Sequence, residues 1–312
     1  MTQPLISIVI LTYKRQAALL QTIEAALRQE YENFEIIVVD NHSEDGTTEL
    51  VQKKFPQVRL IVMAENSGCA GRNAGFSAAK GEILVSIDND ISFDSLHELQ
   101  KIVTFFDARP RVACITFCIL QPPHGKLSVR DWCHPRSYWG FADKAFPTYY
   151  IAEGACAFRK SIIEQTGGYD PRFFINHEGF DLALRIFRLG YEIYYTPEVK
   201  VWHDEASGIQ KSWRPYFYNS RNYLFLAWKH FRPFFGLRFL APRIVMLLLF
   251  AARTGNLRYY FKGLVAGIKE RRGLMASRVP MPKSVERQLR EMLSYRPGLF
   301  FWLRRHKKKP LL

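Results

Sequence analysis

Four short apolar runs, each followed by a stretch of different character, constrain the fold of this chain more than any other feature. Because they are nearly continuous and rich in β-branched residues, they are typical of strands buried on both faces. The segments between them, such as 18–29 and 69–79, carry apolar residues at helical spacing or small residues suited to a helix. This alternation predicts an α/β domain with a mostly parallel sheet and right-handed crossovers. The runs are Leu5–Leu11, Glu35–Asp40, Val58–Val62 and Ile83–Asp88.

The pattern changes after about residue 110. A further strand is expected at 112–120, and Asp94 is expected to cap the helix before it. Several prolines then mark an irregular, aromatic-rich stretch up to about residue 150. Glu178–Leu189 has the pattern of a helix ended by Gly190, and two short strands should follow it.

The positive charge of the chain is concentrated in its last third. Residues 1–200 carry 21 Lys and Arg against 24 Asp and Glu, whereas residues 201–312 carry 23 against 5. The sequence therefore predicts a catalytic domain at 1–212 and a basic, aromatic, helical region at 213–312. A nucleic acid, an anionic membrane surface or a phosphorylated substrate could each explain such a region. With 48% hydrophobic residues, a disordered chain is excluded.

Cysteine usage and the start of the chain indicate a cytoplasmic protein. The five cysteines are an odd number without regular spacing, as expected of reduced thiols. The first residues show no signal-peptide pattern. In the most apolar segment, 234–252, charged residues and Pro242 leave only Ile244–Ala252 uninterrupted, which is too short to span a membrane.

Acidic residues follow two of the predicted strands. Asp88 and Asp90 lie at i and i+2 after the fourth run, where their carboxylates would point the same way and suit Mg²⁺ or Mn²⁺ bridging a diphosphate. Turns also commonly contain such residues, so a structural role stays open. Asp40 could accept a hydrogen bond from a ribose or a base, with Ser43 or Asp45 capping the next helix.

Three further positions could carry chemistry. Arg72 lies in a loop of small residues, 66–75, where it could contact a phosphate, although an ordinary loop–helix junction would look the same. Glu178 could project from the start of its helix as a general base, while Asp181 and Arg185 could form a simple i, i+4 pair. His203, at the end of a predicted strand, could be a metal ligand or a structural histidine.

Taken in order, these segments resemble glycosyltransferase family 2, with its GT-A fold, over roughly residues 5–230. The resemblance implies an inverting hexosyl- or deoxyhexosyltransferase that uses a nucleotide-diphosphate sugar and a divalent metal. The motifs are SIVILTYKR, VVDNHSEDGT, NSGCAGRNAGF, SIDND, IAEGA, HEGFDLALR, and VKVWHD followed by SRN.

The resemblance also implies a role for particular residues. The donor nucleotide would contact Thr12, Tyr13, Asp40, Arg72 and Asp88. The metal would be held by Asp88, Asp90 and His203, and Glu153 would lie near the acceptor. The catalytic base of the family belongs to an acidic pattern whose second position is Gly179 here, so Glu178 is the first candidate and Asp181 the second.

The basic region is expected to attach the enzyme to the cytoplasmic face of a membrane. It interleaves aromatic residues with Lys and Arg, which suits an interfacial helix and a glycan or lipid-linked acceptor in cell-surface polysaccharide or glycolipid assembly. Packing of this apolar surface on the catalytic domain would explain the same pattern. Alternatives are a nucleic-acid-binding protein, which lacks a recognisable motif here, a nucleotidyltransferase on a similar fold, and an inactive relative with the same fold.

Overall fold

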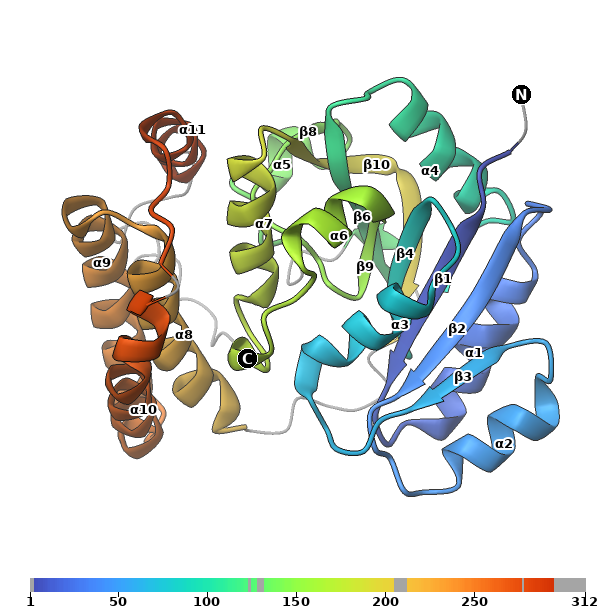
Figure 1. The fold of residues 1–312 in the computed structure, drawn as a ribbon, viewed down its shortest axis with the longest axis horizontal. Helices are drawn as coiled ribbons and strands as arrows, with labels where there is room; N and C mark the ends of the chain where they lie inside the picture. The colour runs from blue at the N-terminus through green and yellow to red at the C-terminus, as the bar shows by residue number, and fades with distance from the viewer. Residues whose placement is uncertain (1–2, 123–124, 128–131, 205–211, 277, 295–312) are drawn as a thin grey trace.

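The computed structural model describes residues 3–122, 125–127, 132–204, 212–276 and 278–294. Over this part the chain forms a twisted sheet with helices on both faces, followed by a layer of C-terminal helices (Figure 1). The predicted α/β fold and the helical C-terminal extension are therefore confirmed.

The sheet is mostly parallel, with its main strands in the order β3-β2-β1-β4-β9-β6-β10-β5. Strand β9 runs antiparallel between β4 and β6, and β5 runs antiparallel to β10. The short β7 and β8 pair with β6 and β10. The strands are β1 (Ile6–Thr12), β2 (Phe34–Asp40), β3 (Arg59–Val62), β4 (Ile83–Asp88), β5 (Ile91–Phe93), β6 (Val112–Gln121), β7 (Lys126–Leu127), β8 (Phe146–Pro147), β9 (Ala155–Arg159) and β10 (Glu192–His203).

Helices cover the two faces of the sheet in separate layers. Side chains of α1, α2 and α4 form a core with Ile8 of β1, whereas α3, α6 and α7 pack on the face of Val9. Successive residues of β1 are thus buried on opposite faces, which explains its continuous apolar run. The helices are α1 (Gln16–Leu27), α2 (Thr47–Lys54), α3 (Arg72–Ala78), α4 (Glu98–Asp107), α5 (Tyr138–Phe141), α6 (Lys160–Thr166), α7 (Glu178–Arg188), α8 (Arg214–His230), α9 (Pro233–Arg253), α10 (Leu257–Ala276) and α11 (Lys283–Ser294).

Two local predictions were wrong. Asp94 does not cap α4, which begins at Glu98 after the short strand β5; its carboxylate instead accepts a hydrogen bond from Trp202 Nε1 at 2.7 Å. The two strands predicted after α7 form one strand, β10, because a shift in register between Tyr195 and Lys200 absorbs the irregular middle of the segment.

The apolar segment near residue 240 is also longer than predicted. Helix α9 continues through Pro242, so the charged residues and the proline do not divide it. The helix has 21 residues, and an 18-residue window of it has a mean hydropathy of 1.9, so it is the one described helix that meets the length and composition of a membrane span. Core helices of soluble proteins can meet the same criterion.

The C-terminal helices share a hydrophobic core with α7 and the face of the sheet that it covers. Phe225 of α8, Phe239 of α9 and Leu289 of α11 are buried in the same cluster as Leu184 of α7. Figure 1 shows α8 lying between α7 and the outer helices. Part of the aromatic content of this region is therefore explained by packing on the α/β domain.

Candidate active site

The polar residues of the predicted site gather where three parallel strands end. Thr12 of β1 is paired in register with Asp40 of β2, and its neighbour Leu11 with Asp88 of β4. Asn89 Nδ2 donates a 2.8 Å hydrogen bond to Thr12 Oγ1 and links two of these strand ends. The parallel topology thus brings together residues that are 28 to 77 positions apart in the sequence.

Both carboxylate oxygens of Asp40 accept hydrogen bonds from residues that follow it closely in the sequence. Its Oδ1 accepts the Ser43 N–H at 3.0 Å, and its Oδ2 accepts the Thr48 hydroxyl at 3.0 Å. Asp45, rather than Ser43, accepts the N–H of Thr47 at the start of α2. The carboxylate of Asp40 therefore fixes the β2–α2 turn, on the same edge of the sheet as Thr12.

Arg72 is buried beneath the end of β4. Its guanidinium forms an ion pair with Asp88 and donates to Ser86 Oγ at 3.1 Å and to Cys69 Sγ at 3.2 Å. A Cβ at Gly154 would lie 2.2 Å from Asp88 Oδ2, so the backbone here approaches this carboxylate as only glycine allows. The position of Asp88 is thus fixed from both sides.

Asp90 and His203 face each other across the sheet edge. Asp90 Oδ2 lies 3.7 Å from His203 Nε2 and is also paired with the guanidinium of Arg15. Burial alone would raise the pKa of Asp90, but the neighbouring His203 and the charge of Arg15 hold that pKa below its usual value. A cavity of about 250 Å³ opens beside this pair, with Asp90 and Trp202 in its wall.

The acidic edge fits a divalent cation only in part. An aspartate oxygen and an imidazole nitrogen lie together at Asp90 and His203, and Arg15 already places a positive charge against them. This pair of donor types suits Mn²⁺. Within the described ranges, however, no three candidate ligands converge on one point, because Asp88 turns toward Arg72.

Glu178 begins α7 and is buried, with 5% of its surface exposed. Its Oε2 is shielded from solvent and has no hydrogen-bond partner among the residues the structure describes. Burial raises the pKa of Glu178, while the charge of Arg72 and a contact with the Cys69 thiol oppose that rise. A carboxylate with an unused oxygen remains available to a ligand.

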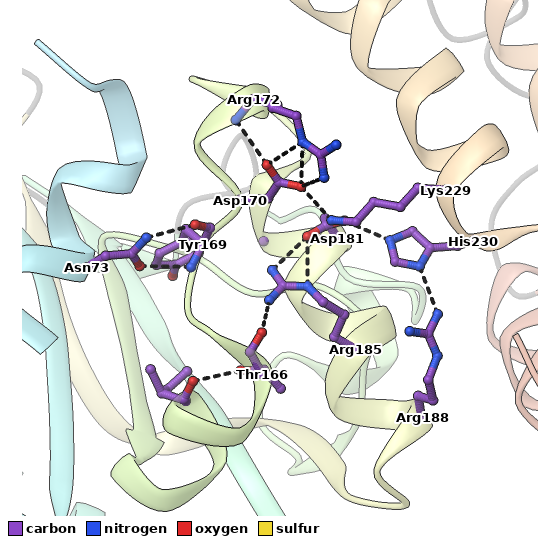
Figure 2. Close-up of polar contacts among 12 residues, drawn as sticks. Asn73, Thr166, Tyr169, Asp170, Arg172, Asp181, Arg185, Arg188, Lys229 and His230 are labelled. Atoms are coloured by element: carbon purple, nitrogen blue, oxygen red, sulfur yellow. Dashed lines mark hydrogen bonds and ion pairs between the residues drawn. The ribbon is translucent and has the colours of Figure 1, made fainter. Parts of the chain in front are cut away.

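Asp181 lies one turn further along α7 and is surrounded by cationic groups (Figure 2). It accepts from Arg185 Nε at 2.9 Å, from Lys229 Nζ at 2.6 Å and from His230 Nε2 at 2.7 Å. Although burial favours the neutral acid, Arg185 and His230 hold the pKa of Asp181 far below its usual range. Lys229 also pairs with Asp170, so the network ties α7 to α8.

Glu153 lies in the loop before β9 and contacts the start of α7. Its Oε1 accepts the backbone N–H of Gly179 at 2.8 Å. Burial, followed by the negative charge of Glu178, raises the pKa of Glu153. The structure therefore brings Glu153 and Glu178, 25 positions apart in the sequence, to one place.

Three residues of this region were not predicted from the sequence. Arg15, Lys229 and His230 were not singled out, although each contacts a carboxylate of the site or of its supporting helix. Arg15 follows the first strand within the motif SIVILTYKR, which was a usable signal. Lys229 and His230 gave no such signal, because their partner Asp181 is 48 or 49 positions away in the sequence.

Comparison with solved structures identifies the fold as GT-A. The mannosyltransferase PcManGT from Pyrobaculum calidifontis, solved in complex with GDP-Man and Mn²⁺, is similar with a TM-score of 0.56 and 18% identity. The similarity covers 94% of this chain and 85% of that one. At 18% identity, this similarity shows the fold that the two chains share.

The sequence comparisons give the family. The model of "Glycosyl transferase family 2" matches residues 7–167, and the chain belongs to this family. It is 23% identical over 249 residues to "Probable glycosyltransferase YdaM" of Bacillus subtilis, covering 75% of this chain and 59% of that protein. It is 37% identical over 89 residues to the "UDP-Glc:alpha-D-GlcNAc-diphosphoundecaprenol beta-1,3-glucosyltransferase WfaP" of Escherichia coli, covering 28% and 35%. The chain therefore spans less than two thirds of either relative.

Proposed function

We propose that this protein transfers a hexose or deoxyhexose from a nucleotide-diphosphate sugar to an acceptor hydroxyl, with inversion at the anomeric carbon. The observation that carries the proposal is the connection between Asp88, at the end of β4, and the start of α7. Asp88 N donates to Gly154 O at 3.1 Å, and the neighbouring Glu153 accepts from Gly179 N at 2.8 Å. The charges of Arg72 and Asp88 both act on Glu178, so the acidic edge and this carboxylate belong to one site. The donor found with PcManGT supports a nucleotide sugar.

The donor nucleotide is proposed to lie across the ends of β1, β2 and β4. Tyr13 is 38% exposed beside Thr12 and offers a surface for the base. Asp40 and its neighbours would hold the ribose, and Arg72 would place Asp88 near the diphosphate. Each of these residues orients the donor, and orientation of bound groups contributes strongly to rate.

The divalent metal, Mg²⁺ or Mn²⁺, is proposed to bind at Asp90 and His203, with Asp88 nearby. When bound, such a cation neutralises the charge that grows on the leaving diphosphate. Asp90 supplies a carboxylate oxygen and His203 an imidazole nitrogen, with Asp90 Oδ2 and His203 Nε2 3.7 Å apart. The side chain of Arg15 would have to give up its place at Asp90 when the metal binds.

The acceptor hydroxyl is proposed to lose its proton to Glu178. Asp181, the second candidate, has its oxygens occupied by Arg185, Lys229 and His230, which assigns it to holding α7 on α8. Glu178 instead has a free oxygen and a raised pKa, both useful in a group that accepts a proton.

The acceptor is proposed to be a growing glycan or a lipid-linked sugar at a membrane. The relative WfaP is named for transfer to a diphosphoundecaprenol-linked sugar, which is a lipid-linked acceptor. A nucleotidyltransferase reaction would release pyrophosphate, whereas the reaction proposed here releases a nucleoside diphosphate.

A panel of donors tests the proposed function directly. UDP-glucose, UDP-N-acetylglucosamine, GDP-mannose and dTDP-rhamnose would each be added with Mn²⁺ and the melting temperature measured. At least one is expected to raise it, since a ligand that binds only the folded state stabilises that state. Release of nucleoside diphosphate would then be followed for that donor. No shift with any nucleotide sugar, or release of pyrophosphate, would contradict the proposal.

The metal site gives a separate prediction. Asp90→Asn is expected to weaken Mn²⁺-dependent binding of the selected donor by more than the roughly 10–100-fold that loss of an outer-shell partner costs. Isothermal calorimetry with and without Mn²⁺ measures the effect. Asp94→Asn is the matched control, because Asp94 is an acid of the neighbouring strand end that binds Trp202. Equal affinities for Asp90→Asn and the wild type would rule out this residue as a ligand.

The exposed faces of α9 and α10 are proposed to lie on an anionic membrane. Phe234, Leu237 and Leu249 of α9 are 69%, 65% and 52% exposed, and their spacing places them on one stripe of the helix. On α10, Phe261 and Ile268 are also exposed and are interspersed with basic residues. The basic residues are Arg258, Lys262, Lys269, Arg271 and Arg272. Apolar area edged by cations is what an interfacial helix requires.

Vesicle flotation tests this surface. Leu237→Glu with Leu249→Glu is expected to reduce binding to phosphatidylcholine–phosphatidylglycerol vesicles at least about tenfold, since each leucine contributes about 1.5–3 kcal/mol when buried. Val62→Glu, a 54% exposed position on β3, is the control. Release of the wild type by alkaline carbonate is expected of a surface helix, and resistance to it would indicate a spanning one. Unchanged flotation of the double variant would contradict the proposed face.

A further inference from the structure

Gly179 leaves room that the carboxyl group of Glu153 fills. The N–H of Gly179 donates to Glu153 Oε1 at 2.8 Å. A Cβ built on Gly179 would lie 2.2 Å from this same oxygen, closer than any real contact. The backbone at position 179 does not require glycine for its conformation, because φ there is not positive. The carboxyl group of Glu153 therefore occupies the space that a side chain at position 179 would need.

The second carboxyl at this place is that of Glu178. It is nine-tenths buried, and its Oε2 has no hydrogen-bond partner within the described part of the chain. Glu153 is less deeply buried than Glu178, so it is the more accessible of the two. Their mutual influence is visible in the raised pKa of Glu153, to which burial and the charge of Glu178 both contribute. The carboxyl groups of Glu153 and Glu178 come from different elements, and Glu178 Oε2 has no hydrogen-bond partner within the described residues. Such a pair indicates a site for a ligand hydroxyl.

We propose that Glu153 supplies, from the loop before β9, the acidic group that position 179 lacks, and that it acts with Glu178 as one carboxyl pair toward the acceptor. This inference rests on the proposed function. In the transfer, the acceptor O–H bond breaks and its proton passes to the pair, while the acceptor oxygen forms a bond to the anomeric carbon. The bond from that carbon to the diphosphate breaks, and its electron pair leaves with the nucleoside diphosphate.

A conservative substitution tests the role of the second carboxyl. Glu153→Gln keeps an oxygen for the Gly179 N–H but cannot take up a proton. With the donor selected from the panel and water as acceptor, this variant is expected to lower kcat about 10²-fold with little change in donor KM. A kcat equal to that of the wild type would overturn the proposal. Glu164→Gln, on the exposed side of α6, is the control.

Moving the carboxyl group from position 153 to position 179 distinguishes a catalytic carboxyl from a merely structural one. Glu153→Gly is expected to lower kcat by about the same factor as Glu153→Gln, about 10²-fold. Adding Gly179→Asp to Glu153→Gly returns a carboxyl to the same space from the other backbone, and it is expected to restore kcat at least about tenfold. No recovery in a double variant that folds and binds the donor would overturn the proposal.

The placement of Glu153 can be tested without any substrate. Gly179→Ala in the wild type is expected to lower the melting temperature by at least about 2 °C, because the added methyl group collides with Glu153. In the Glu153→Gly background the same change should cost much less. Equal shifts in both backgrounds would show that the two positions do not share space. If no nucleotide sugar binds, the proposed function fails, and this cycle still decides whether Glu153 fills the room at position 179.

Discussion

Glu178→Gln is expected to lower the rate of sugar transfer about 10²–10⁴-fold, the contribution typical of a positioned general base. The substitution keeps the size of the side chain, so the start of α7 should remain in place. Donor binding should be nearly unchanged, because Glu178 is proposed to act on the acceptor and not on the nucleotide. Steady-state kinetics with the selected nucleotide sugar gives kcat, and calorimetry gives the donor affinity.

The control for this prediction is Glu164→Gln, because the side chain of Glu164 on α6 is 63% exposed and its ion-pair partner is Lys160, 3.6 Å away. Its kinetics should match those of the wild type. Undiminished turnover in Glu178→Gln would eliminate Glu178 as the base. Loss of donor binding together with turnover would instead assign it to the donor side.

Asp181→Asn is expected to lower the free energy of unfolding by about 3–5 kcal/mol, the cost of removing one partner from a buried ion pair. Asp181 is fully buried, and the change would leave Lys229 and Arg185 without their shared anion. Urea denaturation measures this loss. Removal of the surface pair by Glu164→Gln should cost no more than about 1 kcal/mol. An Asp181→Asn variant as stable as the wild type would contradict the structural role of the network.

The same network predicts a dependence on pH. Because the pKa of Asp181 is lowered in the folded protein, its contribution to stability is present above the unfolded pKa, about 3.9, and is lost as pH falls below it. The difference in unfolding free energy between wild type and Asp181→Asn should therefore shrink as the pH falls from 5 toward 3. A difference that does not change over this range would show that the charge of Asp181 is unimportant.

Much of the α/β domain could be predicted from local sequence. Runs such as Leu5–Leu11 and Ile83–Asp88 are apolar at every position because both faces of the strand are covered. The acidic residues after them could then be placed at one sheet edge by topology alone. The start of α4 could not be predicted, because Asp94 bonds to Trp202 of β10, 108 positions away. The continuity of α9 could not be predicted either, because Pro242 stands inside the helix without ending it.

The residues that contact Glu178 and Asp181 could not be predicted from local sequence patterns. Asp181 and Glu178 stand about one turn apart on the same helix, and their residue types give no reason to separate their roles. The structure separates them, since one faces Lys229 and His230 of α8 and the other the buried side of Cys69 and Arg72. These contacts join segments up to about 110 positions apart.

The sequence by itself determined the alternating strands and helices, the acidic ends of the strands and the basic C-terminal region, because periodicity, residue type and charge are local properties. Only the tertiary structure decided which carboxylates are held by cations and which remain available, since that depends on the neighbours that folding supplies. It placed the carboxyl of Glu153 in the room left by Gly179, 26 residues away. It also divided the C-terminal aromatic residues between a shared core and an exposed face.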